Sequence, residues 1–275
     1  MSTGSRVKNP AMWFVPSRRE NRRDIFRILR LETRMEMLKL LRAPSFVVPT
    51  FSFPILFYVL FGLLLADKMS SGSATGASAY LLVSYSAFGV IGAHLFALGV
   101  GVAGEKGMGW MRLKRASPMP PLAHFFARIL VALAFGAALV LIMFALGAAF
   151  GGVRLTQATW LGLGLWLILG GIPFSALGLA LGHLLGPNSA PATLNLIYLP
   201  ISFASGLWMP IWFLPEWLQT AAQALPPFHL GVQGHAMIGA ANEAPPLVTS
   251  ALVLAVFTGL SLLLAVTAWR REETE

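Results

Sequence analysis

Six long apolar segments without a single charged side chain constrain this chain more than any other feature. An α-helix rises about 1.5 Å per residue, so crossing roughly 30 Å of hydrocarbon takes about 20 apolar residues. Each segment meets that length, and the sequence therefore predicts an all-α integral membrane protein with six transmembrane helices. The segments are Ser45–Ala66, Tyr80–Ala103, Ile129–Phe150, Trp160–Leu185, Ala192–Phe213 and Leu247–Trp269.

The composition agrees with this class of protein. Charged residues make up only 11% of the 275 residues, whereas a soluble domain carries about 25%. The chain has no cysteine, which excludes disulfides, thiolate metal sites and cysteine nucleophiles. We expect no cleaved signal peptide, because the first apolar segment begins near residue 45, behind a long basic tail.

Lysine and arginine are divided unevenly between the two sides of the predicted bundle. Residues 1–44 carry eleven and the 104–128 connection carries five, whereas the opposite connections hold only Lys68 and Arg154. Because basic segments near the spans stay cytoplasmic, we predict a multi-pass protein of the plasma (inner) membrane with both termini cytoplasmic. This distribution explains the net charge of +9 without a nucleic-acid partner.

The basic tail also has a helical pattern of its own. Between Arg22 and Arg42, apolar residues recur at helical spacing, and arginines and Glu36 fill the other side. The pattern is typical of an amphipathic helix in the cytoplasmic interface, with its cations near anionic headgroups, and Pro44 ends it. A plain topogenic anchor is the alternative. The predicted domains are a tail over 1–44, a six-helix transmembrane domain over 45–270 and a C-terminal tail over 271–275.

Residues for catalysis are largely missing from the spans. The two aspartates, Asp24 and Asp67, lie outside them, and no zinc-protease, nucleophile-elbow or phosphate-loop motif occurs. We therefore predict a protein that is not an enzyme and has no catalytic residue, metal site or cofactor of its own. His94, halfway along the second segment, is a candidate for the transport pathway, although packing is the favoured interpretation. His229 and His235, even with Glu243, are too few ligands to predict a metal site.

Pairs of glycines four residues apart occur in the third and fourth segments. They are Gly147 with Gly151 and Gly178 with Gly182. Such spacing lets two helix backbones approach closely. We expect packing within the chain, with a dimer face as the alternative.

Two connections carry the most informative residues. The cytoplasmic one mixes charged, aromatic and methionine residues in a helix-sized run that ends in prolines, which suits a short helix that docks into a partner. A solvated loop is the alternative. Its key residues are Glu105, Lys106, Gly109, Arg112, Ser117 and Pro118.

The outer connection is an apolar, tryptophan-rich run divided by prolines. The run is too short to cross the membrane again. It predicts a re-entrant or interfacial helical hairpin with tryptophans at headgroup level. Pro215 and Glu216 favour a helix start, and a simple aromatic belt is the alternative. Its key residues are Gly206, Pro210, Pro215, Glu216, Trp217 and Pro226.

These two connections, on opposite sides of a six-span chain, resemble those of the permease subunits of type-2 ABC transporters. The family's cytoplasmic segment reads Glu-Arg-Glu-x-Gly-Thr, then basic and apolar residues and Ser/Thr-Pro. Glu105, Lys106, Gly109, Ser117 and Pro118 fall on that register, whereas Gly107 replaces the second acid and Trp110 the threonine. Arg128 stands where the family has a basic residue that opens the third span, and the outer pattern from Gly206 to Pro226 also matches.

The resemblance implies a permease that has no ATP-hydrolysing domain of its own. It would pair with a second permease copy or paralogue, and each chain would bind a cytoplasmic ABC ATPase that holds the ATP and Mg²⁺. The coupling segment, with the N-terminal helix, would receive the motion of the ATPase, so we expect charge reversal at Glu105 or Arg112 to uncouple transport without preventing insertion. The uncharged spans favour export of a drug, lipid or lipid-linked glycan. An ion-gradient-driven carrier or channel is the alternative, and an assembly scaffold is a third hypothesis.

Overall fold

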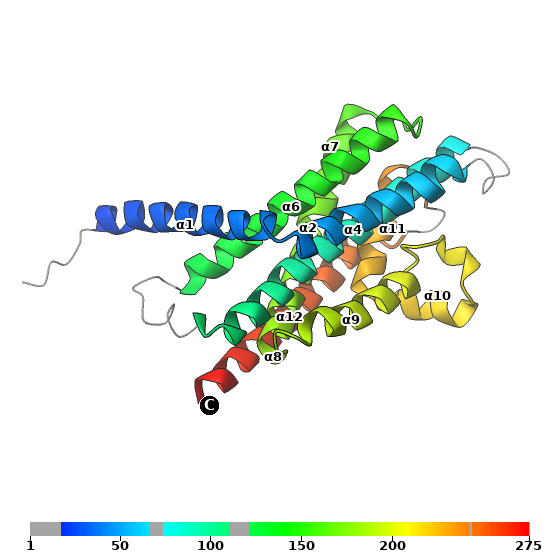
Figure 1. Cartoon of the computed structure of the whole chain (residues 1–275). Coiled ribbons are helices and arrows are strands. Elements are labelled where there is room, and N and C mark those ends of the chain that lie inside the picture. Colours follow the sequence, from blue (N-terminus) through cyan, green and yellow to red (C-terminus); the bar gives the residue numbers. More distant parts are fainter. Residues whose placement is uncertain (1–17, 67–73, 111–120, 242–243, 275) are drawn as a thin grey trace, which may run out of the picture.

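Helices make up every regular element of the computed structural model (Figure 1), which describes residues 18–66, 74–110, 121–241 and 244–274. The all-α prediction is therefore confirmed over these residues. The elements are α1 (Arg18–Leu41), α2 (Pro44–Phe57), the π-helix η1 (Tyr58–Leu64), α4 (Ala74–Gly107), α6 (Pro121–Ala149), α7 (Gln157–Leu169), α8 (Ile172–Leu184), α9 (Ala190–Ala204), the 3₁₀ turn η2 (Ile211–Phe213), α10 (Glu216–Ala222), α11 (Pro226–Met237) and α12 (Leu247–Thr274).

Five helical stretches of the described chain are long and apolar enough to cross a membrane. They coincide with the first four predicted segments and the sixth. They are Pro44–Leu64, Gly76–Gly107, Phe125–Ala149, Gln157–Leu184 and Leu247–Arg271.

The fifth predicted segment, Ala192–Phe213, is not one continuous helix. Its helix α9 has 15 residues, which span only about 22 Å. Pro200 lies inside α9, and Gly206 turns the chain with a φ of 74°, a conformation that glycine adopts without strain. The hydropathy of this segment alone did not show where the helix ends. The count of six full spans is therefore not confirmed.

Helix α4 occupies the centre of the bundle and packs closely against α8. A Cβ atom on Gly178 would lie 2.5 Å from the carbonyl oxygen of Leu95, and one on Gly182 would lie 2.9 Å from that of Gly99. These glycines therefore let the two helix backbones touch. The prediction that Gly178 and Gly182 serve packing within the chain is confirmed.

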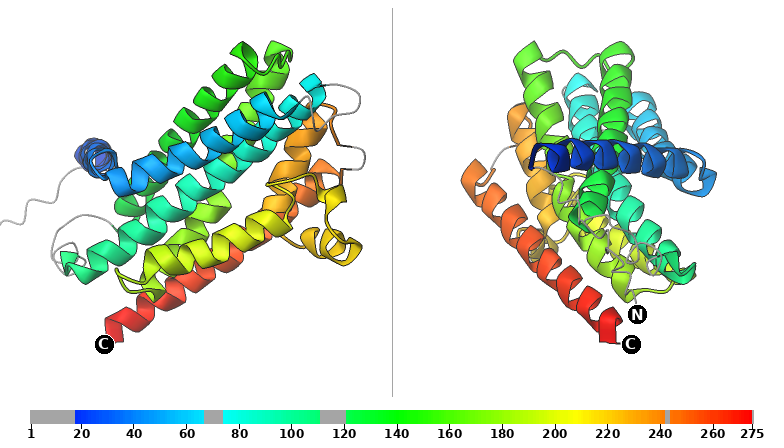
Figure 2. Two further views of the ribbon diagram at one scale, coloured as in Figure 1. Left: turned by 45° about the vertical axis from the view of Figure 1, so that its right-hand side comes forward. Right: turned by 90° about the vertical axis from the view of Figure 1, so that its left-hand side faces the viewer.

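Helix α1 lies across the bundle rather than along it (Figure 2) and packs on α6 and α2. Glu36 and Leu40 are on its buried face, whereas Arg27, Arg30 and Arg34 are exposed. The sequence therefore located this helix correctly. Its place at the membrane surface remains a prediction.

Replacement of Gly178 by alanine tests the contact between α4 and α8. We expect Gly178→Ala to lower the free energy of unfolding by about 1–3 kcal/mol, because the new methyl group meets backbone that has no room to move. Thermal unfolding of the purified protein in detergent measures the effect. Gly162→Ala is the control, because a Cβ there meets nothing within 4 Å. Equal unfolding temperatures for the two variants would contradict the account.

Candidate functional site

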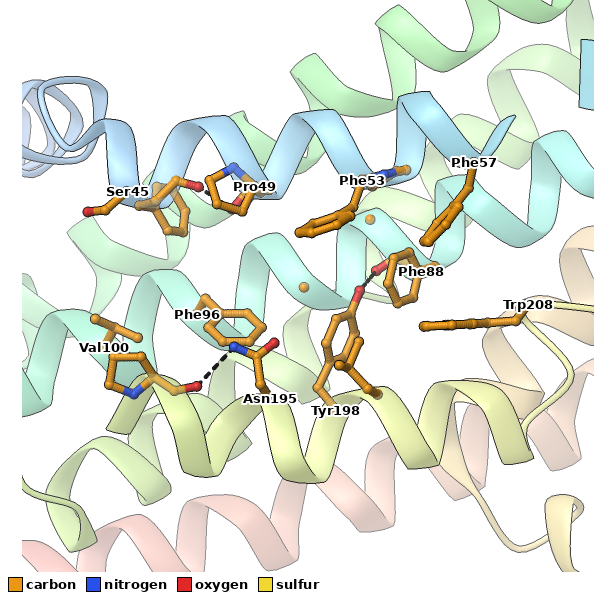
Figure 3. Close-up of a pocket in the computed structure, with 17 residues that line it drawn as sticks. Ser45, Pro49, Phe53, Phe57, Phe88, Phe96, Val100, Asn195, Tyr198 and Trp208 are labelled. Carbon is orange, nitrogen blue, oxygen red and sulfur yellow. Dashed lines mark hydrogen bonds between the residues drawn. The ribbon is translucent and has the colours of Figure 1, made fainter. Parts of the chain in front are cut away.

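An apolar groove of about 540 Å³ lies between α2, α4 and α9 (Figure 3). Its wall carries no charged side chain and no histidine from the described residues. Seven aromatic residues line it, namely Phe46, Phe53, Phe57, Phe88, Phe96, Tyr198 and Trp208. Apolar lining with few polar groups is typical of sites for small organic ligands.

Glycine and proline in the sequence shape this groove. A Cβ on Gly92 would lie 2.8 Å from the hydroxyl oxygen of Tyr198, so the glycine lets α9 approach α4. Pro49 and Pro54 lie inside α2 and have no N–H, so the carbonyls of Ser45 and Thr50 lose their usual donors four residues on. Helix α2 is thus an irregular wall that continues into the π-helix η1.

The polar groups of the groove mostly bond within the protein. The Tyr198 hydroxyl donates to the carbonyl of Phe88 at 2.6 Å, and that of Thr50 donates to the carbonyl of Phe46 at 2.6 Å. The amide nitrogen of Asn195 donates to the carbonyl of Pro191 at 3.0 Å. The groove therefore suits a largely apolar molecule that needs few hydrogen bonds.

Three buried charged side chains, Glu36, Glu105 and Arg128, form a cluster with the exposed Lys39 at the end of the bundle next to α1. Lys39 Nζ lies 2.5 Å from Glu105 Oε1 and 3.4 Å from Glu36 Oε2. Arg128 Nη2 pairs with Glu105 and lies 3.6 Å from Glu36 Oε1. Glu36, Glu105 and Arg128 are 7%, 2% and 4% exposed. Each of the two cations faces both carboxylates.

This cluster joins three helices at the base of one connection. Glu105 lies near the end of α4, and Arg128 lies in the first turns of α6, so the pair closes the ends of the connection that contains residues 111–120. Glu36 and Lys39 add α1 to the same contact. Ion pairs therefore join α1, α4 and α6 at this point.

Of the predicted coupling residues, three lie in the part of the chain that the structure describes and three lie outside it. Glu105 is buried in the cluster, and Lys106 Nζ donates to the carbonyl of His183 at 2.7 Å, in the last turn of α8 where carbonyls lack helical partners. Gly109 has a φ of 71° and lies two residues after the end of α4 at Gly107. Arg112, Ser117 and Pro118 lie outside the described residues.

The burial of Glu105 changes one expectation from the sequence. A reversed charge at this position would face Arg128 and Lys39 inside the bundle. We therefore expect charge reversal to disturb folding as well as coupling.

The outer connection contains two short helices, α10 and α11. Helix α10 begins at Glu216, directly after Pro215, and α11 begins at Pro226. The helix start at Pro215-Glu216 is thus confirmed. Pro210 precedes the turn η2, and Trp217 is 71% exposed. The depth of this module in a membrane remains a prediction.

Helix α11 is fixed by hydrogen bonds through its buried polar side chains. His229 Nδ1 lies 3.0 Å from Ser250 Oγ, and Gln233 donates to the carbonyl of Pro245 at 2.6 Å. His235 Nε2 lies 3.0 Å from Ser84 Oγ, and burial lowers the pKa of this imidazole to about 4. Both histidines thus hold α11 against neighbouring segments through hydrogen bonds. The described residues contain no group of three or more metal-binding side chains, and Glu243 lies outside them.

His94 lies inside the bundle and does not line the groove. Its Nδ1 and Ser175 Oγ share a hydrogen bond of 2.8 Å. A Cβ on Gly171 would lie 2.4 Å from His94 Nε2, so the imidazole fills the space at the break between α7 and α8. This geometry supports the packing interpretation.

Sequence reasoning missed the groove and the role of α1 in the cluster. Pro49, Pro54 and the lone amide Asn195 in apolar segments were the available signals for the groove. No local pattern indicates that Lys39 meets Glu105, which is 66 residues away.

Long apolar helices around an uncharged groove define a multi-pass membrane protein built like a transporter. The chain belongs to the ABC-2 family of transporters, because the profile described as "ABC-2 family transporter protein" matches residues 66–267. It is also 26% identical over 246 residues to "Putative transport permease YvfS" of Bacillus subtilis (strain 168), across 90% of this chain and 98% of that protein. The predicted resemblance is confirmed. The chain is thus a transport permease subunit, and the region that the family profile matches contains Glu105 and Arg128 but not α1.

Loss of the Arg128 guanidinium tests the buried cluster. We expect Arg128→Met to lower the free energy of unfolding by about 3–5 kcal/mol, because two buried carboxylates lose their deepest counter-charge. Arg34→Met, on the exposed side of α1, should stay within about 0.5 kcal/mol of the parent. Thermal unfolding in detergent measures both. A similar, small effect in the two variants would show that the cluster does not stabilise the bundle.

Proposed function

We propose that this permease is the membrane subunit of an ATP-driven exporter that moves a lipophilic or amphiphilic molecule across the plasma membrane. A drug, a lipid or a lipid-linked glycan fits this description. The apolar, uncharged groove between α2, α4 and α9 is the observation that carries the proposal. A bare ion would need charged or carbonyl-lined walls, whereas aromatic walls suit an apolar body.

The energy would come from a separate ABC ATPase that binds ATP and Mg²⁺ on the cytoplasmic side. The sequence contains no phosphate-binding loop motif. Beside the 111–120 connection, Met108 and Trp110 are 63% and 52% exposed, which offers an apolar contact for the ATPase. The charged cluster would then pass the movement of this connection to α1, α4 and α6.

A second permease chain, identical or paralogous, would complete the groove. Leu196 is 75% exposed on α9, and Val48 and Phe53 are 57% and 53% exposed on α2. Asn195 is also exposed on this face, and an amide in contact with lipid tails gains from a partner helix. Membrane lipids would surround the remaining helices. In this arrangement both termini are cytoplasmic.

Transport in inside-out vesicles tests the energy source. The vesicles contain the permease together with its candidate ABC ATPase subunit, and the probe is a neutral lipophilic fluorescent dye. We expect dye accumulation to require ATP and to stop when the catalytic glutamate of the ATPase is changed to glutamine. Accumulation that needs no ATP and stops with a protonophore would instead support an ion-gradient-driven carrier.

Photo-cross-linking tests the second permease chain. We expect benzoylphenylalanine at Leu196 to yield a cross-linked product with a permease chain, identified by mass spectrometry, because this position faces outward beside the groove. The matched position is Leu165 on α7, which is 60% exposed but distant from the groove lining. Lipid adducts alone at both positions would contradict the paired arrangement.

A further inference from the structure

A second apolar cavity continues the groove beyond Trp208. This far chamber has a volume of about 390 Å³, and Phe57 and Trp208 line both it and the groove. The groove extends from these two residues toward α1. The far chamber extends toward the outer module and is also lined by Leu65, Tyr85 and Met209. Phe57 and Trp208 therefore stand between two spaces.

Ring contacts connect the residues at the boundary between the two chambers. The ring centroids of Phe57 and Trp208 are 5.4 Å apart, and those of Phe88 and Trp208 are 5.7 Å apart in an edge-to-face arrangement. Phe88 in turn stacks on Tyr198 at 4.8 Å. Figure 3 shows Phe57, Phe88 and Trp208 gathered at one end of the groove. A molecule that passes from one chamber to the other must separate these rings.

Trp208 is fixed at its backbone but not at the polar edge of its ring. The Tyr85 hydroxyl donates to the carbonyl of Trp208 at 3.1 Å. The indole Nε1 is buried and has no hydrogen-bond partner among the residues that the structure describes. Trp208 follows the Gly206 turn and belongs to no helix. Its ring can therefore swing without breaking a backbone hydrogen bond.

Phe57 lies at the junction between two helix types. It is the last residue of α2, and the π-helix begins at Tyr58. Single π-helical turns are frequent at functional sites. Tyr58 is fully buried, and its hydroxyl and Ser78 Oγ share a hydrogen bond of 3.0 Å. A change of helical register beside this fixed point would rotate Phe57 relative to Trp208.

We infer that Phe57 and Trp208 form an aromatic gate between the groove and the far chamber, and that the indole N–H of Trp208 contacts the passing molecule. The unpaired N–H is costly while buried, so a molecule that brings a neutral acceptor satisfies it. The gate thus selects apolar molecules that carry a carbonyl, ester or amide oxygen. This inference rests on the proposed transport function for its biological use, but its test needs neither the ATPase nor the natural substrate.

Thiol accessibility measures the gate directly, because the chain has no cysteine of its own. Thr50→Cys reports on the groove and Met209→Cys on the far chamber. A small membrane-impermeant methanethiosulfonate is added to vesicles from the side of α10. We expect Met209→Cys to react and Thr50→Cys to react slowly. With Trp208→Ala or Phe57→Ala, Thr50→Cys should react about tenfold faster, because the aromatic contacts that hold the gate closed are lost.

Two matched variants separate the gate from general loosening of the fold. Trp208→Phe keeps a ring and should keep Thr50→Cys slow. Phe150→Ala removes an aromatic residue that is 74% exposed and lines neither chamber, and it should have no effect. Equal reactivity of Thr50→Cys with and without the Trp208 and Phe57 rings would overturn the gate.

Protection by a probe tests the contact with the indole. N-dodecylacetamide carries an amide carbonyl on an apolar chain, and dodecane lacks it. We expect the amide, but not the alkane, to slow labelling of Met209→Cys, and Trp208→Phe to abolish that difference. Equal protection by both probes, or the same protection in Trp208→Phe, would overturn the selection by the N–H. Failure of the thiol-labelling test or of the probe test would leave the transport proposal intact. If the labelling results are as expected but no ATP-dependent transport is found, that result would count only against the transport proposal.

Discussion

Glu105 lies near the end of α4 and Arg128 in the first turns of α6, yet their side chains meet inside the bundle, where they also pair with Glu36 and the exposed Lys39 of α1. Removal of such charges from water is expensive, and only close opposite charges offset the cost. The pairing is shared, because each carboxylate faces a lysine and an arginine. The contact ties α1, which lies across the bundle, to the facing parts of α4 and α6.

Helix α4 links that contact to the groove. It carries Glu105 near one end, Phe88 and Phe96 on the groove wall, and the backbone surface that receives Gly178 of α8. Because α8 and α4 touch through glycine, they have little freedom to slide independently. A push on the end of α4 would therefore move the groove wall and α8 together, which is the kind of rigid-body change that drives switching proteins.

The elements that depend on local pattern were predictable from the sequence. Uncharged apolar runs located five of the spans, Pro215 and Glu216 located the start of α10, and glycine spacing identified the face of α8. The fifth segment was predicted to continue as a span to Phe213, whereas α9 ends at Ala204, because the apolar residues beyond Gly206 belong to the outer connection. Glu36 was expected on the polar side of α1 and is instead buried, because its partner Arg128 comes from a distant part of the chain. The groove also depends on long-range packing, which hydrophobicity alone does not encode.

Distance measurement across the working transporter tests the central claim that the buried cluster passes force from the cytoplasmic connection to the helices. Spin labels at Arg34→Cys on α1 and Phe150→Cys beyond α6 occupy exposed positions in a chain without native cysteine. The account predicts that trapping the partner ATPase with ATP shifts the distance between these labels, and that Arg128→Met abolishes the shift. An equal shift in the presence and absence of Arg128, or none in either protein, would contradict it.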